Sequence, residues 1–134
     1  MNAKLEVFIR KMAHIAALQE DAVEKGYNTC LAAAEELEQQ TLKYYRGLYG
    51  GMYKFAEAFL ESSAPGNVPI FESDDLVENA DDIDAFKEFL GRAEIESFWA
   101  PSTCYELTAA LFTSGWTVAE KAEGLYGYTR FVKE

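Results

Sequence analysis

Apolar residues recur at helical spacing from the start of the chain. Between residues 5 and 16 they return every three or four positions, which places them on one face of a helix. Asn2 can cap this helix, and Lys25 followed by Gly26 is a typical helix end. The pattern therefore predicts a first helix that ends near residue 25. Its buried face comprises Leu5, Phe8, Ile9, Met12 and Ile15 or Ala16.

A second helical pattern begins at Asn28 and continues to about residue 62. Gly50 and Gly51 interrupt it, and each glycine costs roughly 1 kcal/mol relative to alanine inside a helix. This region is therefore one kinked helix or two helices that meet at the glycines, and we favour a kink or short break. The stripe expected to face inward comprises Cys30, Ala34, Leu37, Thr41, Tyr44 and Leu48, and then Met52, Phe55, Ala56 and Phe59.

A loop over residues 62–69 follows, because two prolines and a Pro-Gly pair cannot continue a helix. Beyond it we predict a short helical turn near residues 74–79. A longer helix follows, capped by Asp81 or Asp82 and ended by Gly91. Its apolar face comprises Ile83, Phe86, Phe89 and Leu90.

The last third of the chain is harder to interpret. Residues 103–115 have the pattern of another helix. Residues 116–134 fit a helix or a β-hairpin around residues 124–127, since Thr, Val, Tyr and Phe suit strands, and we favour the helix. The predicted fold is all-α for the most part. It is a single compact domain over residues 1–134 with five to six helices, in which the loop at 62–70 separates the long-helix half from an acidic half.

Composition supports a folded, acidic protein. The chain of 134 residues is 49% hydrophobic and 14% aromatic, which is enough to bury a core and argues against disorder. Its 23 acids and 12 bases give a net charge of −11. That sign opposes direct binding to nucleic acid or to an anionic membrane. It favours a basic partner, or serves solubility alone. No apolar run is long enough for a signal peptide or a membrane span, so we expect a cytoplasmic protein.

Residues for covalent or metal chemistry are few. The chain has one histidine, His14, and two cysteines, Cys30 and Cys104, which lie far apart in sequence. No zinc or di-iron motif can be assembled from them, and the acidic stretch lacks the glycine of a calcium-binding loop. We therefore expect a protein that is not an enzyme, with no catalytic residue, no metal site and no cofactor.

Carboxylates gather in the middle of the sequence, where eight of the 23 acids fall in residues 72–88. Helix N-termini need acceptors, which accounts for about half of them, namely Asp74, Asp75, Asp81 and Asp82. The excess suggests a surface that meets positive charge, although solubility is the simpler alternative. The acids expected to bind a partner are Glu72, Asp75, Glu78, Asp82, Asp84 and Glu88.

Residues 42–55 depart from the acidic background, with three cations and four tyrosines. Tyr45, Tyr49 and Tyr53 step by four and would form a second stripe, more exposed than the inward one. Tyrosine is enriched at interfaces, so this stripe is a candidate face for binding or self-association. The alternative is that the three rings pack beneath neighbouring helices.

These observations favour a non-enzymatic binding protein. The leading hypothesis is an inhibitor or nucleic-acid-mimicking decoy that presses its carboxylates onto a basic surface of a protein partner, such as a nucleic-acid-handling complex. In composition alone the chain resembles phage-encoded inhibitors of restriction and CRISPR systems, that is, viral anti-CRISPR and anti-restriction proteins. The alternative is a homo-oligomeric or adaptor module joined through the tyrosine stripe.

Overall fold

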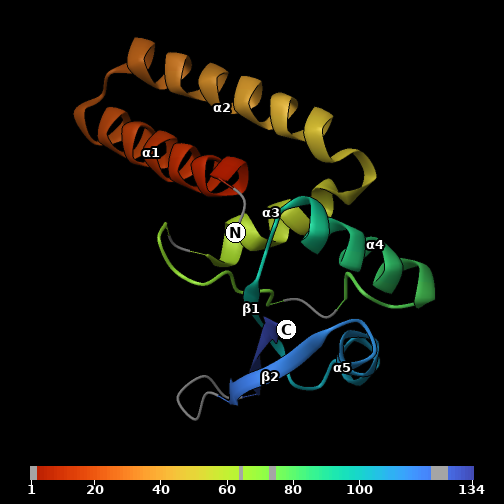
Figure 1. The fold of residues 1–134 in the computed structure, drawn as a ribbon. Coiled ribbons are helices and arrows are strands. Elements are labelled where there is room, and N and C mark those ends of the chain that lie inside the picture. The colour runs from red at the N-terminus through yellow and green to blue at the C-terminus, as the bar shows by residue number, and fades with distance from the viewer. Residues whose placement is uncertain (1–2, 64, 73–74, 122–126) are drawn as a thin grey trace.

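The computed structural model describes residues 3–63, 65–72, 75–121 and 127–134, and it is mostly helical with a small antiparallel sheet (Figure 1). Among these residues no helix is long and apolar enough to cross a membrane. The elements in chain order are α1 (Ala3–Lys25), α2 (Asn28–Tyr49), the 3-10 helix η1 (Gly50–Met52), α3 (Tyr53–Ser62), α4 (Ala80–Arg92), β1 (Ser97–Pro101), α5 (Tyr105–Phe112), β2 (Trp116–Lys121) and β3 (Tyr128–Lys133).

The first two helices form an antiparallel hairpin, as their predicted boundaries imply. Gly26 has a φ of 70°, and this left-handed conformation lets the chain reverse between α1 and α2. Small or branched side chains are buried along the hairpin, such as Ile15 and Ala22 on α1 and Ala34 on α2. Figure 1 shows the two helices side by side, with their connecting turn at the end remote from α3.

The predicted break at the glycine pair is confirmed. α2 ends at Tyr49, and Gly50 follows with a φ of 55°, a conformation that favours glycine. One turn of 3-10 helix then leads directly into α3. This break redirects the chain, so that α3 runs beneath the base of the hairpin rather than prolonging α2 (Figure 1).

The sheet has the strand order β1-β3-β2, with both pairs antiparallel and β3 in the centre. Phe98 on β1 lies opposite Phe131 on β3, and their rings stack with centroids 5.5 Å apart. The other edge of β1 is covered by the segment before α4. There the amide of Phe71 donates to the carbonyl of Trp99, and the amide of Trp99 donates to the carbonyl of Pro69, each at 2.8 Å.

Phenylalanine rings form the centre of the core. They come from α3, α4, the segment before α4, and strands β1 and β3, so one aromatic cluster joins the helices to the sheet. Ring centroids lie between 4.8 Å, for Phe71 and Phe86, and about 6 Å, and edge-to-face contacts are frequent. The fully buried rings of this cluster are Phe55, Phe59, Phe71, Phe86, Phe89, Phe98 and Phe131.

The C-terminal part corrects the sequence prediction. The helix favoured for residues 116–134 is wrong, because β2 and β3 pair as strands there, while residues 122–126 lie outside the described residues. Strand β1 was not anticipated, and residues 75–79 are not helical. The described residues form five α-helices and one turn of 3-10 helix, but the last predicted helix is replaced by strands, so the expected set of helices is matched only in part. Along β3, Thr129 and Phe131 are buried while their neighbours are partly exposed, and this two-residue alternation is typical of a strand.

Candidate binding surface

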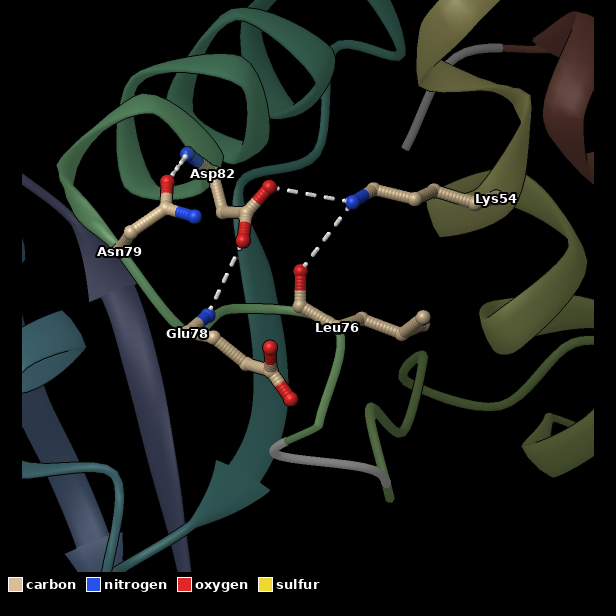
Figure 2. A network of polar contacts seen from close by, with 5 residues as sticks. All are labelled: Lys54, Leu76, Glu78, Asn79 and Asp82. Atoms are coloured by element: carbon tan, nitrogen blue, oxygen red, sulfur yellow. Dashed lines mark hydrogen bonds and ion pairs between the residues drawn. The ribbon is translucent and has the colours of Figure 1, made fainter.

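A network of polar contacts holds the segment before α4 against α3 (Figure 2). We call this segment, residues 75–79, the acidic segment. The Nζ atom of Lys54 on α3 lies 3.2 Å from an oxygen of Asp82 and donates to the carbonyl of Leu76 at 3.4 Å. The other oxygen of Asp82 accepts from the amide of Glu78 at 3.1 Å. One lysine and one aspartate therefore fix the backbone of residues 76–78 from two sides.

The same network includes the N-cap of α4, which differs from the predicted one. Neither Asp81 nor Asp82 is the N-cap; the side chain of Asn79 takes that position and accepts from the amide of Asp82 at 3.0 Å. The hydrogen bond from the amide of Glu78, followed by the interaction with Lys54, lowers the pKa of Asp82 below its ordinary value. Asp82 is therefore a carboxylate held in its charged form by this chain's own groups.

The six acids nominated from the sequence fall into two sets. On α4, Asp84 lies 3.9 Å from Lys87 and Glu88 lies 3.5 Å from Arg92, in exposed ion pairs. With Asp82, that makes three carboxylates with a cation of the same chain beside them. Glu72, Asp75 and Glu78 precede α4, are exposed, and form no ion pair within the described part of the chain.

Two open hollows lie beside this acidic segment. The first has a volume of about 360 Å³ and is lined by Asp75 and Glu78 together with Glu106 of α5. The second, of about 420 Å³, is lined by Glu72, by two acids on consecutive turns of α3, and by Lys54, which pairs with Asp82. We call the six carboxylates that line these hollows the acidic face. It comprises Glu57, Glu61, Glu72, Asp75, Glu78 and Glu106.

The acidic face includes aromatic groups at its edges. Tyr105, the first residue of α5, lines the first hollow and is 75% exposed. Burial raises the pKa of Tyr128 on β3, and the nearby charge of Glu72 adds to this rise. Tyr128 therefore stays neutral at physiological pH. Both rings offer apolar area and hydroxyl groups beside the carboxylates.

Three of the acids in this face were not nominated from the sequence. Glu57 and Glu61 are four residues apart, so the helical pattern of α3 already placed them on one side. Their proximity to Glu72 depends on how the segment before α4 returns past α3, which the sequence pattern does not specify. Glu106 joins the face for the same reason, through the packing of α5 beside Val77 and Glu78.

The tyrosine stripe predicted to be exposed is instead buried. Tyr45, Tyr49 and Tyr53 are only 3, 5 and 7% exposed, and burial is the main cause that raises the pKa of each phenol. Tyr45 stacks on Phe8 of α1 with ring centroids 4.1 Å apart, and Tyr49 meets Phe89 of α4 edge-on at 5.4 Å. At the base of α2 the buried face therefore lies about one residue, or roughly 100° around the helix, from the stripe that the sequence predicted.

The described residues contain no group of three or more histidine, cysteine or acidic side chains placed to hold a metal ion. Cys30 is exposed on α2 and Cys104 is buried before α5, and His14 is exposed on α1 beside Arg10 and Lys11.

The comparisons with known proteins define no relationship for this chain: no family model, curated protein or solved structure matches it. The class that the fold defines is a mostly helical protein whose small antiparallel sheet shares one aromatic core with the helices.

Proposed function

We propose that this protein is a non-enzymatic binding protein whose acidic face docks on a basic surface of a protein partner. The observation that carries the proposal is the set of six carboxylates around two hollows, none of which has an ion pair within the described residues. Like charges repel, so such a surface costs free energy unless a partner or solvent offsets it.

Contacts within the chain anchor the backbone that carries part of this surface. Lys54 and Asp82 anchor residues 76–78, and the segment at residues 69–71 pairs with β1. Acids fixed on a rigid backbone lose less entropy on binding than acids on a free loop. Carboxylates arranged in this way can occupy a groove built for phosphates, which supports the role of an inhibitor or decoy that competes with nucleic acid. By analogy of composition, an anti-restriction or anti-CRISPR inhibitor remains the particular version that we propose.

The alternative of a homo-oligomer joined through Tyr45, Tyr49 and Tyr53 is less favoured. Those rings pack against Phe8 of α1 and Phe89 of α4 inside the molecule. They offer little area to a second copy unless the core opens.

Charge reversal on the acidic face tests the proposal. The test variant replaces Asp75, Glu78 and Glu106 with lysine. The matched control replaces Glu24, Glu94 and Glu96, which are exposed acids that line neither hollow, so both variants change the net charge equally. Both immobilised variants and the native protein are used to capture proteins from a lysate of the source cells, and the bound proteins are eluted with a salt gradient.

We expect the native protein and the control to retain the same basic protein to similar salt concentration, and the face variant to lose it. Purified partner can then be competed off with duplex DNA or with RNA, which a decoy must exclude. Equal capture by the two variants would show that net charge alone, rather than the acidic face, attracts the partner.

A further inference from the structure

One face of the α1–α2 hairpin is covered at its base, the end near α3, and uncovered toward its tip, the end with the turn at Gly26 (Figure 1). On α1 this face begins with Leu5 and Ile9, which are buried in the core, and continues with Met12 at the core's edge. Steps of three and four then lead to Ala16 and Val23, which are exposed. Val23, at 64% exposed, therefore lies on the continuation of a stripe that is fully buried at its start.

α2 shows the same change along its length. Tyr49, Tyr45 and Leu42 pack against the core at the base of the hairpin. The same spacing continues toward the tip through Glu38 and Glu35 to Leu31. α3 contacts both helices and lies at the base of the hairpin (Figure 1). Among the described residues, Figure 1 shows no third helix against the distal half of this face.

A groove occupies the uncovered half. It has a volume of about 870 Å³ and lies between α1 and α2, where its apolar lining includes Ala16, Val23, Leu31 and Ala32. Between Ala16 and Val23 the groove extends for about 10 Å, or two helical turns. A helix laid here would continue the three-helix packing that α3 begins at the base.

The groove is also strongly acidic. Residues 16–39 contain six acids and one lysine, Lys25, which pairs with Asp21 at 3.1 Å. Glu20, Glu35 and Glu36 line the groove and have no ion pair within the described residues. Glu36 accepts from Gln40 at 3.1 Å, and Glu38 accepts from Gln19 at 2.7 Å. A second copy placed groove to groove would set carboxylates against carboxylates, which costs free energy.

From the apolar lining and its charge we propose that the groove binds a basic amphipathic helix of a protein partner, which completes a three-helix bundle with α1 and α2. Leucine-like side chains would cover Val23 and Leu31, and lysine or arginine flanking them would meet Glu20, Glu35 and Glu36. This inference does not depend on the acidic face, which lies on other elements of the chain.

The test uses the full chain and a fluorescein-labelled peptide of about five helical turns. Its leucines form one stripe, and lysines flank them. A scrambled peptide of the same composition carries the same charge without the stripe, and fluorescence anisotropy measures both affinities. Val23→Lys places a cation in the groove; Leu18→Lys makes the same change at an exposed apolar position of α1 that does not line it.

We expect the striped peptide to bind at least about tenfold more tightly than the scrambled one. Val23→Lys should remove that advantage, whereas Leu18→Lys should preserve it, with circular dichroism confirming that both variants stay folded. Glu35→Gln and Glu36→Gln remove charge from the groove, so they should weaken binding of the striped peptide and make its affinity less dependent on salt. Glu24→Gln, which lies outside the groove lining, should leave both unchanged.

Two outcomes would overturn the inference. Equal binding of the scrambled peptide would show attraction by charge without recognition of a helix. Sedimentation that reveals a dimer dissociated by Val23→Lys would mean that a second copy, not a basic helix, occupies the groove.

Discussion

The ammonium of Lys54 on α3 lies 3.2 Å from the carboxylate of Asp82 at the start of α4, and this contact joins positions 28 residues apart. Lys54 also bonds to the carbonyl of Leu76, and Asp82 to the amide of Glu78. The ion pair is partly exposed, so its Coulombic contribution is modest. Its main consequence is geometric, because it fixes the backbone that carries the acidic segment.

Asp82→Asn should lower stability in a manner that depends on pH. The pKa of Asp82 is lowered in the folded state, so its contribution is fully present above the unfolded value of about 3.9 and is lost as pH falls through the folded value. Thermal unfolding should show a lower Tm for the variant at pH 7 and a difference that shrinks below about pH 4. A difference that is constant with pH would contradict the charged role of Asp82.

Lys54→Met should loosen the segment before α4 while it leaves the core intact. The variant keeps an apolar stem of similar length but loses the donor to Leu76 and Asp82. Hydrogen exchange should be faster at the amide of Glu78, which depends on the orientation of Asp82, than in the native protein. Lys43→Met is the control, since Lys43 is an exposed cation on α2. Unchanged exchange at Glu78 would show that Asp82 holds it unaided.

Two adjacent tyrosines should respond very differently to truncation. Tyr45 is 3% exposed and stacks on Phe8, whereas Tyr44 is 59% exposed. Tyr45→Ala should lower the free energy of unfolding by about 3 kcal/mol or more, and Tyr44→Ala by less than about 0.5 kcal/mol. Chemical denaturation measures both values. Comparable small losses would indicate that Tyr45 is accessible, as the sequence pattern suggested.

Loss of the α4 N-cap should lower the free energy of unfolding by a small but measurable amount. Asn79→Ala removes the acceptor for the amide of Asp82 and should destabilise the protein by about 1 kcal/mol, while Asn79→Ser should restore most of it. In Tm this corresponds to roughly 3–5 °C. If alanine and serine gave the same Tm, the cap assignment would be wrong.

The helical half of the fold could be predicted from the sequence because its signals are local. Gly26 and the Gly50-Gly51 pair mark ends that the structure places where expected, and the face of α1 from Leu5 to Ile15 is the one that is buried. The predicted buried face of α2 is right at Ala34 and Thr41, which are buried, and wrong at Leu37 and Tyr44, which are exposed. Near its end the helix meets α4 as well as α1, so Tyr45 and Tyr49 pack against Phe8 and Phe89 instead.

The sheet and the acidic face depend on contacts that are distant in sequence. β1 contains Pro101 and only five residues, so its pattern is too short to distinguish from a loop, and its partner β3 lies about 30 positions later. Glu57 and Glu106 similarly come together around the segment before α4 only through tertiary packing. The excess of carboxylates could be counted from the sequence, and Lys87 and Arg92 lie only three and four residues from Asp84 and Glu88. The cation that Asp82 meets could not be predicted, because Lys54 is 28 residues away.

The central place of β3 also orders events during synthesis. α1 and α2 are synthesised first and are adjacent in sequence. β1 and β2 are both synthesised before β3, the central strand with which each of them pairs. Until residues 128–133 follow, Phe98 lacks the ring of Phe131 and both strands lack backbone partners in the sheet. The aromatic core therefore stays incomplete until β3 is made, and we expect the nascent chain to be most prone to aggregation in that interval.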